Sequence, residues 1–260
     1  PFIKDIIWHE NEDNLLRSID SCVVAVPPNN QDIVLGKILK YKNIKNLILE
    51  KPPASNPEKA KNLLFEIKRN NINVIFGFSF LYCEWYGQIR KLILNNKKSI
   101  YIDWNFKAYH FSKNLFNWKR EHDQGGGVLR FYGIHLIAVL AELGIDHCSI
   151  SNLIRDNYGF LSKWESEFKF NSGIKVNMIV DSNNDKQLFE IGSIEDDSKL
   201  PFLKIKDPFI KEEKIGNHDI KINILRKLIM ESNNSNKEKL NYYENLLDLW
   251  NNCELKLIQE

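Results

Sequence analysis

Three short apolar runs, each followed by a loop, constrain the fold of this 260-residue chain most strongly. The runs cover residues 21–26, 46–49 and 73–78, and the segments between them carry apolar residues at helical spacing. Buried strands that alternate with helices are typical of a doubly wound parallel sheet with right-handed crossovers. Ligands bind such sheets at the carboxyl ends of the strands. In this sequence those ends are Pro27-Pro28, Glu50-Lys51-Pro52 and residues 77–81.

The pattern changes after residue 81. Periodicity predicts helices over residues 85–94, 129–143 and 239–257, and strands over residues 99–109, 149–155, 161–170 and 175–180. Asn171-Ser172-Gly173 is predicted to be the hairpin turn between the last two strands, and the polar residues 231–239 a loop. We therefore expect a Rossmann-like α/β domain in residues 1–81, followed by an α+β domain with an open, mainly antiparallel sheet in residues 82–260.

Composition excludes several classes of function. The formal net charge is only +2, so no global field selects nucleic acid as a partner. The four cysteines lie far apart without a Cys-x-x-Cys pair, which predicts free thiols in a reducing cytoplasm and no metal site. No apolar run approaches the ~20 residues that a membrane span needs. The sequence predicts a cytoplasmic protein with neither a membrane nor a nucleic-acid partner.

Glu50-Lys51-Pro52 is the first candidate for chemistry, because it directly follows a buried strand. A lysine at this edge of the sheet would reach a ligand, and burial readily shifts the pKa of a lysine. The alternative is a surface ion pair at a strand end.

The second candidate is Gly125-Gly126-Gly127, followed by a predicted helix that carries Tyr132 and His135. Glycines allow the backbone to approach a ligand closely, and a histidine there could move a proton to or from a substrate hydroxyl. The alternative is a histidine that belongs to the core of an apolar helix.

Taken together, the two patterns resemble the glucose-fructose oxidoreductase / inositol dehydrogenase (Gfo/Idh/MocA) superfamily. In that family a Glu-Lys-Pro strand end follows an earlier apolar strand that ends in a proline pair, here Pro27-Pro28. A tryptophan and a basic residue come next, then a glycine-rich turn and a helix of pattern Asp-x-Gly-x-His. Trp118-Lys119, Gly125 to Gly127 and Gly133-x-His135 occupy those places.

The resemblance implies NAD- or NADP-dependent hydride transfer at a hydroxyl or carbonyl of a sugar, nucleotide sugar or cyclitol. Lys51 and His135 would be the catalytic residues. The residues implied to bind the cofactor are Pro27, Pro28, Glu50, Lys51 and Pro52; those implied to bind the substrate are Trp118, Lys119, Tyr132 and His135. The first domain would bind the dinucleotide, and the second would bind the substrate and form a homo-oligomer through its sheet.

Two features depart from the family pattern. Phe131 stands where the family has the aspartate, so an apolar ring replaces a hydrogen-bond acceptor, unless Tyr132, Asp123 or Glu121 substitutes for it. The chain also lacks the first βαβ unit with its G-x-G-x-x-G loop, which seats the pyrophosphate. We expect a partial sequence or a mis-assigned start, and a degenerate protein is the other option.

Three functions remain open on the sequence alone. The first is a sugar oxidoreductase. The second is a degenerate, non-catalytic member that serves as a binding or assembly module, which Phe131 and the absent glycine loop favour. The third is an NAD-dependent glycoside hydrolase, for which no residue discriminates.

Overall fold

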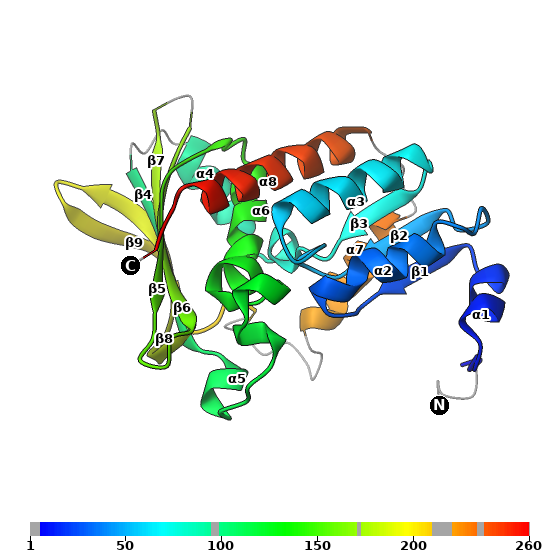
Figure 1. The fold of residues 1–260 in the computed structure, drawn as a ribbon. Coiled ribbons are helices and arrows are strands. Elements are labelled where there is room, and N and C mark those ends of the chain that lie inside the picture. Colours follow the sequence, from blue (N-terminus) through cyan, green and yellow to red (C-terminus); the bar gives the residue numbers. More distant parts are fainter. Residues whose placement is uncertain (1–5, 95–98, 171–172, 210–219, 233–236, 260) are drawn as a thin grey trace.

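The computed structural model describes residues 6–94, 99–170, 173–209, 220–232 and 237–259. The first sheet is fully parallel and has the order β1-β2-β3, formed by Ser21–Val24, Asn46–Leu49 and Asn73–Phe76. Helix α1 (Glu12–Ser18) precedes it, and α2 (Pro28–Ile38) and α3 (Pro57–Arg69) connect its strands (Figure 1). The predicted Rossmann-like architecture is confirmed.

Local sequence explains where the connecting helices begin. The Asn56 side chain accepts a hydrogen bond from the Lys59 backbone N–H at 2.9 Å and so caps α3, and Pro57 occupies the first turn. Helix α2 starts at Pro28, the second residue of the proline pair, and Pro27 is its N-cap; β1 ends earlier than predicted, at Val24. The Gln31 side chain in the first turn of α2 donates hydrogen bonds to the carbonyl oxygens of Glu50 and Pro52, and so joins the start of α2 to the loop that follows β2.

The second sheet is mixed and has seven strands in the order β10-β5-β6-β7-β4-β8-β9. The strands are β4 (Ser99–Lys107), β5 (His147–Arg155), β6 (Leu161–Lys169), β7 (Lys175–Asp181), β8 (Asn183–Glu195), β9 (Ser198–Ile205) and β10 (Leu257–Gln259). Most neighbours are antiparallel, but β4 pairs with β7, and β10 with β5, in parallel. The α+β architecture predicted for this half is confirmed.

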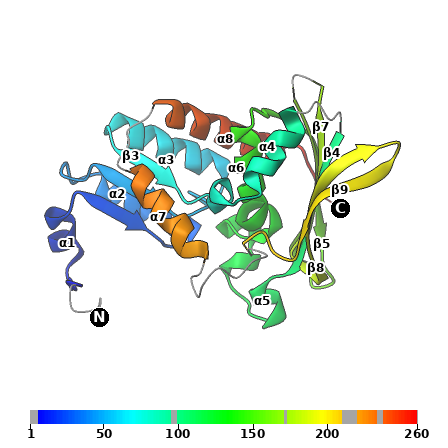
Figure 2. The ribbon, with the colours of Figure 1, turned by 180° about the vertical axis from the view of Figure 1, so that it is seen from behind.

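The remaining helices join the two sheets. They are α4 (Tyr86–Leu94), the short α5 (Tyr109–Ser112), α6 (Ile134–Glu142), α7 (Ile220–Ser232) and α8 (Lys237–Leu255). Helix α6 lies between the sheets and is buried from Ile134 to Ala141, while α8 runs beside α3 and α6 (Figure 1). Viewed from behind, α7 crosses the face of the first sheet and contacts β2 and β3 (Figure 2). The C-terminal part of the chain therefore packs on both sheets.

Some predicted boundaries were wrong. The helix predicted over residues 129–143 begins as a π-helical turn, Val128–Gly133, before α6. The loop predicted over residues 231–239 is helical at both ends, since α7 ends at Ser232 and α8 begins at Lys237. The predicted hairpin turn lies outside the described residues except for Gly173, which has a φ of 86°. Strands β8 and β9 were not predicted.

In the described part of the chain, no helix is long and apolar enough to cross a membrane. All four cysteines are free, and within the same residues no cluster of histidine, cysteine and carboxylate side chains could hold a metal ion.

Candidate active site

A cleft of about 720 Å³ opens where the carboxyl ends of β2 and β3 face the second sheet and α6. Glu50 and Lys51 follow β2, and Gly77 follows β3. The opposite wall comes from β4 and its loop, and from the π-helical turn and α6. Lys51, Tyr132 and His135 all line this space. The cleft thus combines the strand ends of the parallel sheet with residues from both of the sequence patterns that were predicted to carry chemistry.

Lys51 sits in a constrained turn, residues 50–55, which we call the lysine turn. The Lys51–Pro52 peptide bond is cis. The buried Gln31 side chain, from the first turn of α2, donates hydrogen bonds to the carbonyl oxygens of Glu50 at 2.9 Å and Pro52 at 3.0 Å. Both flanks of Lys51 are therefore held by one side chain, which sequence analysis did not single out.

The Lys51 amine is half-buried and makes two contacts with Phe131. Its Nζ donates a hydrogen bond to the Phe131 carbonyl at 2.8 Å and lies 3.7 Å from the centre of the Phe131 ring. Burial lowers the pKa of Lys51 to about 7; the Glu50 carboxylate opposes this shift and Lys119 adds to it. Near neutral pH the amine consequently exists in both protonation states, as a proton-transfer group requires.

His135 lies in the first turn of α6 and is 4% exposed. Its ring stacks on Phe80 with centroids 4.7 Å apart, and its Nδ1 atom is buried without a hydrogen-bond partner. Burial first, and then the positive charge of Lys51, hold the pKa of His135 well below its usual value. The imidazole is therefore neutral at physiological pH and has an unused polar atom.

Phe131 stands at the position where the resemblance implies an aspartate, but its contacts differ from those that a carboxylate would make. Its main chain accepts the hydrogen bond of Lys51, and its ring covers the amine. Of the residues considered as substitutes for the aspartate, only Tyr132 lines the cleft, where burial raises the pKa of its hydroxyl. Asp123 and Glu121 are exposed and do not line it.

The other residues implied by the resemblance surround the cleft without lining it. Pro27 and Pro28 form the start of α2, and Pro52 lies in the lysine turn. Trp118 meets the Phe131 ring edge to face at 5.3 Å, and Lys119 Nζ lies 5.5 Å from the centre of that ring. Both therefore contact the Phe131 ring, and neither lines the cleft.

Sequence analysis missed the outer walls of the cleft. One wall is the end of β4 with its loop, another the segment after β9, and the third is α7. The lining residues that they supply include Lys107, Tyr109, Lys206, Asp207, Leu225 and Leu228. Lys206 and Asp207 follow a strand that was not predicted, and α7 was not predicted at all, so this part of the cleft had no sequence signal.

The glycine turn, residues 121–127, packs tightly against its surroundings. A Cβ atom on Gly126 would lie 2.1 Å from the Trp118 carbonyl oxygen, and one on Gly125 would lie 2.6 Å from Pro28 Cβ. Gly125 and Gly127 also have positive φ angles, of 86° and 72°. The glycines allow this turn to lie directly against the proline pair, as expected for a close approach of backbone.

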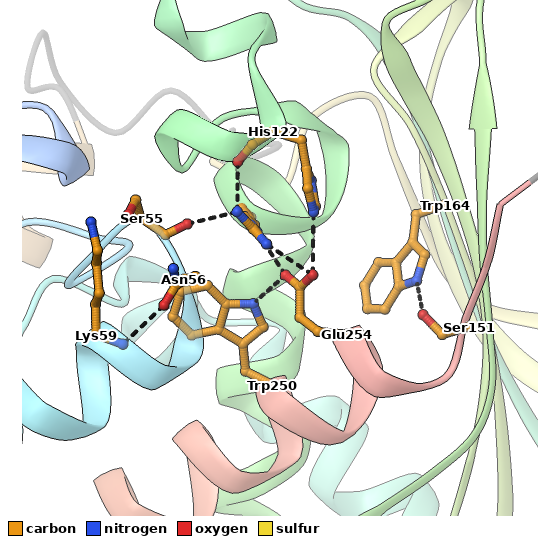
Figure 3. A network of polar contacts seen from close by, with 9 residues as sticks. Ser55, Asn56, Lys59, His122, Ser151, Trp164, Trp250 and Glu254 are labelled. Atoms are coloured by element: carbon orange, nitrogen blue, oxygen red, sulfur yellow. Dashed lines mark hydrogen bonds and ion pairs between the residues drawn. The ribbon is translucent and has the colours of Figure 1, made fainter.

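A buried ion pair connects this turn to the last helix. Arg130 donates to both carboxylate oxygens of Glu254 in α8, from Nε at 2.8 Å and from Nη2 at 3.1 Å. Trp250 Nε1 also donates to Glu254, at 3.0 Å, and His122 Nε2 lies 3.2 Å from it (Figure 3). Burial raises the pKa of Glu254, but the hydrogen bonds of His122 and Arg130 outweigh it and lower the pKa to about 2.

No protein-family model matches the chain, and no curated protein matches it. Solved structures do. KijD10, a 3-ketoreductase from Actinomadura kijaniata with NADP and TDP-benzene, superposes with a TM-score of 0.70 at 13% identity over 96% of this chain and 83% of that one. GenD2 from gentamicin A biosynthesis, with NAD, has a TM-score of 0.73 at 12% identity, covering 95% and 79%. Levoglucosan dehydrogenase, with NADH and levoglucosan, has a TM-score of 0.66 at 12% identity, covering 95% and 82%.

The chain has the fold of these nicotinamide-dependent oxidoreductases. Each of the three was solved with NAD or NADP in an oxidised or reduced form. The fold expected from the Gfo/Idh/MocA resemblance is thereby confirmed, while the low identities leave the activity to be argued from the cleft itself.

Proposed function

We propose that this protein catalyses NAD- or NADP-dependent hydride transfer at a hydroxyl or carbonyl group of a sugar, nucleotide sugar or cyclitol. The observation that carries the proposal is the Lys51 amine, which lies in the cleft with His135 at the carboxyl end of a parallel sheet. Ligands of doubly wound folds bind at this edge. The solved neighbours of this fold support a sugar-like substrate, since one holds TDP-benzene and another levoglucosan.

Oxidation of a carbinol removes a hydride from carbon and a proton from oxygen. A bound nicotinamide would accept the hydride, which is the chemistry of the cofactor. The neutral Lys51 amine accepts the hydroxyl proton, and in the reverse direction its ammonium form returns that proton to the carbonyl oxygen. The Phe131 carbonyl, 2.8 Å from Nζ, orients the amine for this transfer. Lys51 is therefore the proposed general acid and base.

His135 has a different proposed role. Because its pKa is well below the usual value, an imidazolium is not the proton donor at neutral pH. Its buried, unpartnered Nδ1 is instead suited to a hydrogen bond with a substrate or cofactor polar group. We propose His135 as a substrate anchor, with Tyr132 beside it. Trp118 and Lys119, which pack against Phe131, would act on the substrate side through that residue.

The residues present fit the nicotinamide end of the cofactor. Glu50, Lys51 and Gly77 line the cleft at the strand ends, Pro27 and Pro28 stand at the start of α2 against the glycine turn, and Pro52 lies in the lysine turn. The 260 residues contain no G-x-G-x-x-G loop for the pyrophosphate. The assignment of the cofactor therefore rests on the nicotinamide end.

Calorimetric titration with NADH, NADPH and nicotinamide mononucleotide tests the proposal. We expect saturable binding of at least one dinucleotide, and binding of the mononucleotide as well, because the cleft supplies the nicotinamide end. Lys51→Met should weaken both, whereas Lys61→Met, on the surface of α3, should weaken neither. A chain that binds none of the three ligands would contradict the proposed function.

The second candidate is a non-catalytic binding or assembly module. The specific observation in its favour is Phe131, which places a ring where the resemblance requires a carboxylate. Turnover of any sugar alcohol or ketose that disappears in Lys51→Met would exclude it. Absence of turnover, with a sugar-like ligand still bound in the cleft, would favour it.

We further propose that the protein is cytoplasmic, where its four free cysteines would remain reduced, and that it forms a homo-oligomer through the seven-stranded sheet. The proposed contact strands are β6 and β7. Light scattering should give a mass that is a multiple of 30.6 kDa, and charge reversal at the half-buried Glu165 of β6 should reduce it. A monomeric mass at micromolar concentration would contradict this proposal.

A further inference from the structure

Arg130 stands between the two parts of the chain that form the hydrogen bond of Lys51. Its Nη1 atom donates to the Ser55 carbonyl of the lysine turn at 2.9 Å and to the His122 carbonyl of the glycine turn at 2.8 Å. In sequence it directly precedes Phe131, whose carbonyl accepts from Lys51 Nζ. Arg130 is thus hydrogen-bonded to the lysine turn through its guanidinium and linked through its main chain to Phe131, whose carbonyl accepts the hydrogen bond of Lys51.

Glu254 fixes the guanidinium in that place. Its carboxylate accepts two hydrogen bonds from Arg130, and the Arg130 and Glu254 side chains are only 11% and 12% exposed. The planar, two-point geometry of such a pair sets the orientation of the arginine as well as its position. Trp250, one turn earlier on α8, donates a further hydrogen bond to the Oε1 atom of the same carboxylate (Figure 3).

We infer that Arg130 and Glu254 are positioning residues for Lys51, through which α8 sets the geometry of the reacting amine. The inference rests on the proposed function for its catalytic consequence. Neither side chain lines the cleft, so they act on Lys51 only through the lysine turn and the Phe131 main chain. We call the Arg130–Glu254 pair the clamp. Loosening the clamp would let water reach the Lys51 amine and lengthen its hydrogen bond to the Phe131 carbonyl.

Other ion pairs of α8 do not share this arrangement and serve as controls. Lys61 pairs with Asp248 at 2.6 Å, with side chains 39% and 68% exposed, and joins α8 to α3 on the surface. Asp248→Asn therefore removes an α8 ion pair without touching the lysine turn. Glu254→Gln removes the charge of the clamp but keeps its shape, and Glu254→Asp keeps the charge.

The test measures the acetylation rate of Lys51 as a function of pH, by competitive labelling with acetic anhydride and mass spectrometry of the Lys51 peptide. It is performed on the full chain without cofactor or substrate. The titratable groups that face the amine, Glu50, Lys119 and His135, are the same in all variants. We expect the midpoint of the profile to rise by about one pKa unit in Glu254→Gln, a roughly tenfold loss of neutral amine below the midpoint. Asp248→Asn should keep the wild-type midpoint, and the midpoint of Glu254→Asp should lie closer to that of the wild type than to that of Glu254→Gln.

An unchanged midpoint in Glu254→Gln, in a protein that still unfolds cooperatively, would overturn the inference. If Glu254→Gln does not fold, Arg130→Lys provides the same reading, since lysine keeps the charge but cannot reach all three acceptors. Where turnover is measurable, the clamp variants should lower kcat while KM stays near the wild-type value. A shifted midpoint without any nicotinamide binding would support the positioning role and reject the proposed function, so the two failures are distinguishable.

Discussion

Lys51→Met is expected to lower kcat/KM for hydride transfer by about 10²- to 10⁴-fold, the usual contribution of a positioned general acid or base. Methionine keeps the unbranched stem of lysine but cannot accept or donate the proton. Because it also removes a half-buried amine, we expect the thermal midpoint of unfolding to stay the same or rise. Steady-state kinetics and thermal denaturation of the same preparation provide both measurements.

The pH dependence of the two directions of the reaction provides a second test of Lys51 as the proton-transfer group. With a pKa of about 7, the Lys51 amine gains its neutral form as pH rises. Oxidation of the alcohol should therefore become faster through neutral pH, and reduction of the carbonyl slower. Lys61→Met is the control, since that lysine pairs with Asp248 on the surface. A Lys51→Met enzyme that keeps more than a tenth of wild-type kcat/KM would reject the lysine as the proton-transfer group.

The second large effect concerns stability in acid. The pKa of Glu254 is lowered from 4.5 to about 2 in the folded protein, so its contribution is fully present above pH 4.5 and is lost as pH falls through 2. The size of the shift corresponds to roughly 3 kcal/mol. We expect Glu254→Gln to lower the free energy of unfolding by about this amount at pH 7, and by progressively less below pH 4.

Urea denaturation at several pH values checks this expectation. The curves for wild type and Glu254→Gln should converge as pH falls through 2, because the Glu254 carboxylate of the folded wild type becomes protonated there. Asp248→Asn should change the free energy of unfolding by less than about 1 kcal/mol, as is typical of an exposed pair. If the difference in the free energy of unfolding between wild type and Glu254→Gln stays constant down to pH 2, the charge of the Glu254 carboxylate is not what stabilises the folded protein.

The sequence predicted the first sheet well because each of its elements has a local signal. The strands at residues 46–49 and 73–76 are apolar runs, and α3 carries an asparagine cap and a first-turn proline. Strands β8 and β9 have no comparable signal. Strand β9 is largely exposed, and the turn before it uses Asp196 and Asp197 in the left-handed region instead of a glycine. Its pairing with β8 is decided by tertiary packing, which periodicity does not report.

Part of the candidate site could also be predicted from local sequence signals. Lys51 and His135 stand in recognisable local patterns, and the structure brings both into one cleft. Gln31 and Arg130 donate hydrogen bonds to distant main-chain oxygens, and Glu254 accepts hydrogen bonds from the distant Arg130 side chain; no local spacing encodes such contacts. A weak signal did exist: Arg130 interrupts an apolar stretch, and Glu254 stands one turn after the buried Trp250. A charged residue among buried neighbours usually has a charged partner.

The position of α8 has a consequence for how the protein is made. Residues 237–255 leave the ribosome long after the lysine turn, yet they supply the carboxylate that orients Arg130. During synthesis the first sheet can form early, but the surroundings of Lys51 stay incomplete until α8 has emerged. The surroundings of Lys51 are thus completed only after α8 has been made, and a chain that stops before α8 would present the first sheet without the contacts that we propose to position this amine.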